Sequence, residues 1–273
     1  MRRILMFASA LWLLSPLAAA ADIVFDDPSG DDNGPGSYTY PTAPEYKKGS
    51  FDLTKVEIKD AGDKVEIKVY LKNPIEDPWK SRDWPVKGNG FSIQMAVLFV
   101  DQDHKAGSGH DKGIPGLNVA FPEDGRWEKA VIISPQGETR LRSEINDKAK
   151  DMKADLVVPQ KVSVSGKKII AVVSKKDLGA PAAGWGWQLV VQSNEGYPDK
   201  ADLLTRKVNA SAGEHRFGGG RDDDCDPHVI DILAGQAKGD KVEIEAQHKA
   251  LSAYSCEGDP AAWKNAVLPM IYR

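Results

Sequence analysis

Alternation of apolar and polar residues at every second position is the pattern that most constrains how this chain can fold. It runs through residues 51–59 and again through 64–71, and the turn-forming sequence 61–63 separates the two runs. Successive side chains of a strand point to opposite faces, so the pattern predicts a hairpin with one buried and one solvated face. Residues 91–100 are almost continuously apolar, which is typical of a central strand buried on both faces.

Shorter apolar runs predict the remaining strands, and helical patterns are scarce. These runs are 130–133, 162–164, 168–173, 188–192 and 241–246. Residues 142–152 predict at most a turn or two of helix, and 229–233 fit either a strand or a helix. Glycine (25) and proline (17) stand at nearly every junction, which suits short strands joined by turns. We therefore predict an all-β fold, an antiparallel β-sandwich with long loops.

The first residues have the three parts of a secretory signal. Arg2 and Arg3 precede an apolar run over 4–20 that ends in small residues. The alternative is a membrane anchor, but the run is at the short limit for a span. We predict a signal peptide over 1–21, cleaved before Ala21 or Asp22, and a periplasmic or extracellular protein. With no repeat or linker in the remainder, residues 22–273 are expected to form a single domain, and no later stretch is apolar enough to cross a membrane.

Charge and composition exclude several classes of protein. The net charge of −4 becomes −6 when Arg2 and Arg3 are removed with the signal, which argues against a nucleic-acid partner. Apolar residues make up 41% and charged residues 28% of the chain, as in ordinary soluble globular proteins. This balance rules out a disordered tail, a collagen-like fibre and a membrane bundle.

The predicted export of the protein affects the interpretation of its two cysteines, Cys225 and Cys256. In an oxidising compartment they predict a disulfide that closes a loop of about 30 residues. The alternative is two unpaired thiols. We favour the bridge because an exposed thiol is a liability outside the cytoplasm.

The most informative stretch is an acidic, glycine-rich loop over residues 26–42. Asp26, Asp27, Asp31 and Asp32 lie within seven residues, and glycine and proline between them allow sharp turns. Carboxylates that close repel one another unless a cation neutralises them. Oxygen ligands on a flexible loop suit Ca²⁺ better than Zn²⁺ or Mg²⁺, so calcium is the predicted cofactor; the alternative is a solvated turn.

Two further acidic loops are weaker metal candidates. Asp101 and Asp103 follow the buried strand in an Asp-x-Asp pattern that only partly matches known calcium loops. Residues 222–226 are rich in aspartate but contain Cys225, so this loop either binds a cation or is held by the disulfide.

The first acidic loop also resembles a known family. Residues 27–42 are similar to the opening signature of the C-terminal module of glucodextranase, a module that also resembles one in amylopullulanases. Further matches follow in order along nearly the whole mature chain: Phe51-Asp52-Leu53, Asn73-Pro74, Gly90-Phe91-Ser92-Ile93-Gln94, Pro115-Gly116-Leu117-Asn118, Trp127, Gly184-Trp185-Gly186-Trp187, Phe217-Gly218-Gly219-Gly220 and Pro227 to Leu233. The resemblance implies a β-sandwich related to DOMON and family 9 carbohydrate-binding modules. It also implies a non-catalytic role in attachment to polysaccharide or to the cell surface, and it strengthens the calcium prediction.

Exposed aromatic side chains are the usual platforms for sugar rings. Trp79 and Trp84 lie in a polar, proline-rich connection and are the predicted ligand-binding residues, unless they cap the end of the sandwich. Trp185 and Trp187 alternate on a strand, which favours the core. Where the family is expected to have an aromatic residue, this chain has Glu214-His215-Arg216, which argues against a sugar-stacking surface there.

Other chemistry has little support. His104 and His110 share a loop, but no pair of histidines has the spacing of a zinc enzyme. Met95 and His248 are conceivable haem ligands, yet nothing in the sequence brings them together, so haem is not favoured. No nucleophile elbow or phosphate loop is present, so no catalytic residue is predicted. We predict a binding module for α-glucan or cell-envelope polysaccharide; the alternatives are an envelope protein that contacts another protein and a haem-binding redox protein.

Overall fold

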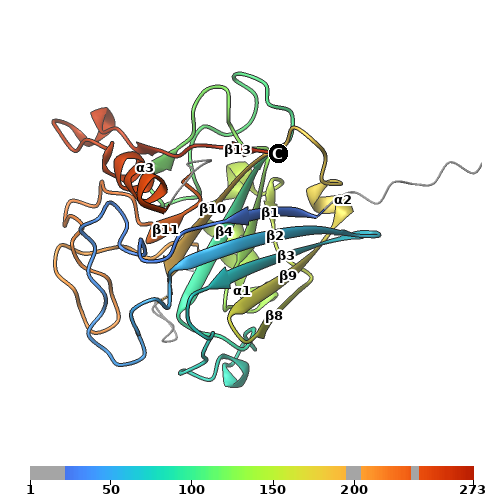
Figure 1. Cartoon of the computed structure of the whole chain (residues 1–273), viewed down its shortest axis with the longest axis horizontal. Helices are drawn as coiled ribbons and strands as arrows, with labels where there is room; N and C mark the ends of the chain where they lie inside the picture. The colour runs from blue at the N-terminus through green and yellow to red at the C-terminus, as the bar shows by residue number, and fades with distance from the viewer. Residues whose placement is uncertain (1–21, 195–203, 235–239) are drawn as a thin grey trace, which may run out of the picture.

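A computed structural model describes residues 22–194, 204–234 and 240–273 of the chain. The predicted signal peptide therefore lies outside the described residues. Two β-sheets pack face to face, and long loops and one helix gather at one end of them, on the left in Figure 1. The antiparallel β-sandwich predicted from the sequence is confirmed.

The first sheet is built around the hairpin that the alternation predicts. The β2–β3 turn contains Gly62, whose φ of 76° is a conformation that favours glycine. All neighbouring strands of this sheet are antiparallel. In sheet order the strands are β1 (Ile23–Asp26), β2 (Leu53–Ala61), β3 (Lys64–Leu71), β9 (Lys168–Ser174) and β8 (Lys161–Ser165).

The second sheet has the continuously apolar strand β4 at its centre. Every residue of β4 is buried, as are those of its neighbour β10. In sheet order the strands are β11 (Asp231–Ile232), β10 (Gly186–Ser193), β4 (Gln94–Asp101), β6 (Lys129–Ile133) and β7 (Leu156–Val157), with β13 (Ile271–Tyr272) also paired to β10. The β6–β7 pair is parallel, as is a separate short pair of β5 (Val119–Ala120) and β12 (Ala266–Val267).

Two hydrophobic clusters explain why the second sheet has no solvated face. One cluster fills the space between the sheets, where β2, β3 and β9 meet β4, β6 and β10. The other covers the opposite face of β4, β6 and β10, with Phe99 and Trp127 at its centre and Leu141, Ile145 and Leu251 from helices. A strand between two apolar layers has no polar face, which accounts for the apolar run from Met95 to Val100 in β4.

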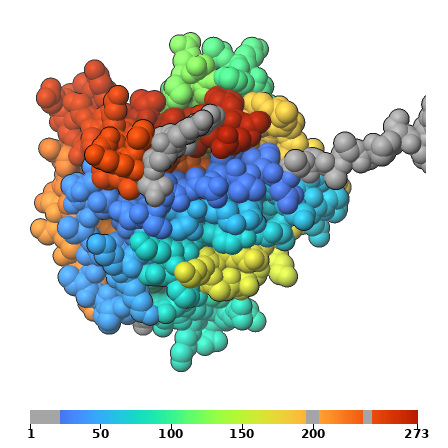
Figure 2. Space-filling view, in the orientation of Figure 1, coloured from blue at the N-terminus to red at the C-terminus, as the bar shows by residue number. Residues whose placement is uncertain are grey.

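The outer face of the first sheet carries the polar half of the alternation. Figure 2 shows β1 to β3 at the molecular surface. Lys55, Glu57, Lys68 and Glu66 form a row of ion pairs there, with N–O distances of 2.7 to 3.5 Å. No helix in the described ranges has the length and hydrophobicity needed to cross a membrane.

Helices are few, and one of them corrects a prediction. Residues 241–246 were predicted to be a strand, but they lie in α3 (Asp240–Ser252), so that prediction is wrong. The side chains buried there are Glu243, Gln247 and Leu251, which recur at intervals of four and define a helical face. Val242 is 54% exposed, so the apparent alternation does not mark a buried face.

The other helices are short. The helix predicted near residues 142–152 is α1 (Glu138–Lys148), followed by the 3-10 turn η2 (Lys150–Met152). The remaining elements are α2 (Lys175–Leu178), η1 (Ser81–Asp83) and η3 (Pro260–Ala262).

Candidate cation centre and polar pocket

Five acidic side chains from four separate parts of the chain meet at the looped end of the sandwich. Oxygens of Asp27, Asp31 and Glu243 lie within 4.8 Å of one another, and so do oxygens of Asp31, Asp52 and Asp231. Asp31 belongs to both groups. We call these five residues the carboxylate centre.

Four of the five acidic side chains of the carboxylate centre are placed by a secondary-structure element or its end, and Asp31 lies in the loop after β1. Asp27 follows β1, Asp52 precedes β2, Asp231 lies in β11 and Glu243 in α3. Figure 1 shows the blue N-terminal loop and α3 at the same end of the molecule. Strand pairing and helix packing thus gather carboxylates that are up to 216 residues apart in the sequence.

Backbone amides fix three of these carboxylates. The Gly30 amide donates to Asp52 Oδ2 at 2.8 Å and the Leu53 amide to Asp231 Oδ2 at 2.7 Å. The Ala234 amide donates to Glu243 Oε1 at 2.7 Å.

Several oxygens of the centre are buried without any hydrogen-bond partner in the described structure. Asp31 is fully buried, yet neither of its carboxylate oxygens accepts a hydrogen bond. The same holds for both oxygens of Asp27 and for Oδ1 of Asp52. A buried carboxylate oxygen without a partner is energetically costly, so these atoms need either a proton or a cation.

The pKa values of the carboxylates in the centre also show that their ionised forms are disfavoured by burial and mutual repulsion. Burial and the nearby charge of Glu243 raise the pKa of Asp31 to about 7. Burial, together with the neighbouring carboxylates, raises the pKa of Asp27 and Asp231 well above the usual range. Burial also raises the pKa of Asp52, although Lys72 partly opposes this at 3.1 Å. Without a cation, the centre would hold protons at a pH where ordinary aspartates are ionised.

The four aspartates proposed from the sequence have different positions. Asp27 and Asp31 lie in the carboxylate centre. Asp26 is an exposed residue of β1 that faces Lys55 across the ladder. Asp32 accepts hydrogen bonds from the Tyr40 hydroxyl and, at 3.1 Å, from the Gly49 amide, so it fixes the loop.

Sequence reasoning missed Asp52, Asp231 and Glu243. Asp231 interrupts the apolar run 229–233 and is fully buried, and a charge inside an apolar run was the available signal. Asp52 stands in the same way between Phe51 and Leu53. Glu243 was hidden by the incorrect strand assignment.

The second acidic loop uses most of its oxygens internally. Asp101, Asp103 and Glu128 have oxygens within 4.8 Å of one another. Asp101 accepts from the amides of Asp103 and His104 and from the Tyr272 hydroxyl at 2.7 Å. These contacts close a turn, and Asp103 itself is exposed.

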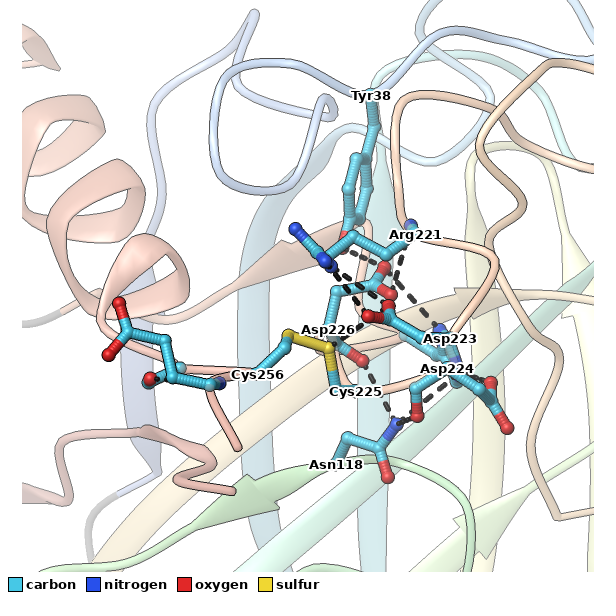
Figure 3. Close-up of a disulfide and its surroundings, with 11 residues drawn as sticks. Tyr38, Asn118, Arg221, Asp223, Asp224, Cys225, Asp226 and Cys256 are labelled. Atoms are coloured by element: carbon cyan, nitrogen blue, oxygen red, sulfur yellow. Dashed lines mark hydrogen bonds and ion pairs between the residues drawn. A yellow bond between two sulfur atoms is a disulfide. The ribbon is translucent and has the colours of Figure 1, made fainter. Parts of the chain in front are cut away.

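The third acidic loop surrounds the disulfide. Cys225 and Cys256 are bonded, as predicted, with their Cα atoms 5.8 Å apart. Figure 3 shows that the neighbouring carboxylates face protein donors. Asp223 pairs with the Arg221 guanidinium at 2.8 Å. Asp224 Oδ1 lies 2.7 Å from His228 Nε2 and accepts a hydrogen bond in the tautomer that is protonated at this nitrogen. Asn118 Nδ2 lies 3.5 Å from the same ring nitrogen.

Tyr38 anchors the first acidic loop to this disulfide loop. Its hydroxyl donates to Asp226 Oδ2 at 3.0 Å and lies within hydrogen-bond distance of the Pro227 carbonyl (Figure 3). Asp226 is fully buried, and burial raises its pKa while the contact with Tyr38 opposes this rise.

Replacing Tyr38 with phenylalanine is therefore expected to destabilise the protein. Tyr38→Phe should lower the free energy of unfolding by about 1–3 kcal/mol, because the buried Asp226 carboxylate loses a donor. Urea denaturation measures the change. Tyr70→Phe, on the outer face of β3, is the control and should cost less than about 1 kcal/mol. Equal effects of the two substitutions would contradict the anchoring role.

A polar pocket of about 540 Å³ opens beside the disulfide. It lies between the first acidic loop and the segment that follows α3. Its lining includes Ser37, Arg221, Ser252, Tyr254 and Glu257. The Arg221 guanidinium is held by both oxygens of Asp223. A concave site of this size with one aromatic ring and several hydroxyl, cationic and anionic groups has the composition needed to bind a polar ligand.

The tryptophans predicted to bind ligand form a different cluster. Trp79 is partly buried and packs against Tyr46 and His215, with ring centroids 5.9 and 5.6 Å away. Trp84 Nε1 donates to the Trp79 carbonyl at 2.9 Å. Trp187 is fully buried in the core between the sheets, as predicted, and Trp185 packs against that core.

The histidines and the methionine considered as metal or haem ligands all have other contacts. His104 stacks on Tyr272, and His110 stacks on Trp127. His248 lies 3.1 Å from Asn33 Oδ1, and Met95 is buried in β4.

Comparison with known proteins agrees with the fold. No curated protein matches the chain at a significant level. Residues 23–269, which include both sheets apart from β13, the carboxylate centre and the polar pocket, match the model of one family. That family is the SLH-like C-terminal binding module of glucodextranase, and this chain belongs to it.

Proposed function

We propose that the protein is an exported, non-catalytic module that is stabilised by calcium and binds polysaccharide, either an α-glucan or a glycan of the cell envelope. The family is one of binding modules, and this supports a carbohydrate partner and a non-enzymatic role. The disulfide supports export because such bonds persist in oxidising compartments.

The observation that carries the calcium proposal is the buried Asp31 carboxylate without a hydrogen-bond partner. Around it, the ligand atoms that the centre offers are carboxylate oxygens from the N-terminal loop, from the residue before β2, from β11 and from α3. Such hard, oxygen-only ligands on elements that can adjust fit Ca²⁺. Asp27, Asp31, Asp52, Asp231 and Glu243 would hold it, and the ion would supply the positive charge that the buried carboxylates lack.

We propose the polar pocket as the saccharide site. Tyr254 would lie against a pyranose ring, while Arg221, Glu257 and the serines offer hydrogen bonds to hydroxyl groups. A second cavity of about 530 Å³, which lies beside β1 and includes Ile23, Val24 and Pro181 in its lining, offers mainly apolar side chains and so fits a sugar less well.

Affinity electrophoresis tests this proposal directly. In gels that contain starch, pullulan, dextran or isolated envelope polysaccharide, at least one polymer should retard the protein. Tyr254→Ala should weaken the retardation by about tenfold, since a lost aromatic stack with its buried area amounts to roughly 1.5 kcal/mol. Tyr70→Ala, which removes a tyrosine from the outer face of β3, is the matched control and should not change it.

The same gels separate the rival outcomes. If Trp84→Ala abolishes retardation and Tyr254→Ala does not, the saccharide binds at the tryptophan cluster and the pocket assignment is wrong. If no polymer retards the wild-type protein, the carbohydrate function itself is rejected.

A further inference from the structure

The carboxylate centre is arranged as two sites rather than one. One group of converging oxygens comes from Asp27, Asp31 and Glu243, and the other from Asp31, Asp52 and Asp231. We propose that the centre binds two divalent cations, both Ca²⁺, and that the Asp31 carboxylate bridges them. This inference rests on the proposed calcium function and extends it to the number and position of the ions.

The free oxygens of the centre are distributed as two sites require. Asp31 is fully buried and offers both of its oxygens, one for each cation. Asp27 offers both of its oxygens to the first site, and Asp52 offers Oδ1 to the second. Each site therefore has at least two buried oxygens that no protein donor satisfies.

Charge also favours two ions over one. The four aspartates of the centre carry four negative charges, and Lys72, which contacts Asp52 at 3.1 Å, offsets one of them. A single divalent cation would leave a net negative charge buried at this end of the sandwich, even before Glu243 is counted. A second divalent cation removes that excess, which a buried site strongly favours.

The two ions would connect different parts of the fold. The first site joins the N-terminal loop to α3 through Glu243, and the second joins the same loop to β2 and β11 through Asp52 and Asp231. The polar pocket has one wall from this loop, at Ser37, and another from the segment after α3. The first cation would therefore hold together the two walls of the proposed saccharide site.

Native mass spectrometry of the full mature chain tests the stoichiometry. Protein stripped with EGTA and returned to Ca²⁺ should carry two calcium ions per chain, and isothermal titration with Ca²⁺ should give the same number. A single bound ion overturns the two-site inference and leaves the proposed function intact. The absence of any bound ion overturns both the inference and the calcium part of the proposed function, whereas saccharide binding is decided separately by the polysaccharide gels.

Conservative variants assign the two sites. Glu243→Gln should leave one ion per chain, at the second site, and Asp52→Asn should leave one, at the first. Asp31→Asn should abolish both, whereas Asp26→Asn, an exposed neighbour on β1, should retain two. Retention of two ions by Asp31→Asn would refute the bridge. If a variant fails to fold by circular dichroism, the wild-type stoichiometry still decides between two ions and one.

Discussion

Removal of calcium with EGTA is expected to lower the melting temperature of the protein by about 8–16 °C. A ligand that binds only the folded state stabilises it in proportion to the logarithm of its concentration over its dissociation constant. For 1 mM Ca²⁺ and a dissociation constant of roughly 1 μM, the gain is about 4 kcal/mol for one site. A chain of this size shifts by about 2–4 °C per kcal/mol. Differential scanning calorimetry in EGTA and in excess Ca²⁺ measures the difference.

The control for this experiment is Asp31→Asn, which removes the buried charge and the predicted ligand together. The melting temperature of this variant should respond little to EGTA or Ca²⁺, while that of Asp26→Asn should respond like the wild type. An identical melting curve for the wild-type protein in EGTA and in Ca²⁺ would rule out calcium as a structural cofactor.

Removal of the disulfide is expected to have an effect of similar size. The double variant Cys225→Ala/Cys256→Ala should lower the free energy of unfolding by about 3–4 kcal/mol, because the bridge joins residues 31 apart and restricts the unfolded chain. Urea denaturation under oxidising conditions measures this loss. Wild-type protein with a reductant should approach the stability of the variant, and a variant as stable as the oxidised wild type would contradict the prediction.

The disulfide variant also tests whether saccharide binds in the polar pocket. Arg221, Tyr254 and Cys256 all line the polar pocket, and Cys256 is bonded to Cys225, four residues after Arg221. The bridge therefore ties together two walls of the pocket. If saccharide binds there, the folded variant should be retarded less than the wild type in the same polysaccharide gels. Unchanged retardation would place the saccharide elsewhere.

The destabilisation expected on removal of calcium and that expected on removal of the disulfide have the same physical cause. The looped end of the sandwich has long connections whose backbone needs support from outside regular secondary structure. In this protein the support comes from buried tyrosine hydroxyls, from one covalent bond and, in our proposal, from cations. Tyr38 joins the N-terminal loop to the segment around residue 225, the disulfide joins that segment to the residues after α3, and the proposed cations would join the N-terminal loop to α3, β11 and the start of β2.

Local sequence patterns were enough to predict the sandwich and its main strands. Period-two alternation in 51–71 and the almost continuously apolar run 91–100 follow directly from which faces of a strand are buried, so β2, β3 and β4 were predictable from local pattern. The disulfide was predictable because only two cysteines exist. The family resemblance was also readable from the glycine- and aspartate-rich opening motif.

Which acidic side chains meet depends on how distant segments pack, and this could not be predicted from the sequence. Asp27 and Asp31 were visible as a local cluster, but their partners Asp52, Asp231 and Glu243 come from the residue before β2, from β11 and from α3. Sequence spacing carries no information about such long-range convergence. Neighbours within the cluster also diverge, since side chains of adjacent residues point in different directions. Asp26 faces solvent and Asp32 holds Tyr40, whereas Asp31 is buried in the centre. Composition could suggest a cation site, but only packing brings these particular carboxylate oxygens together.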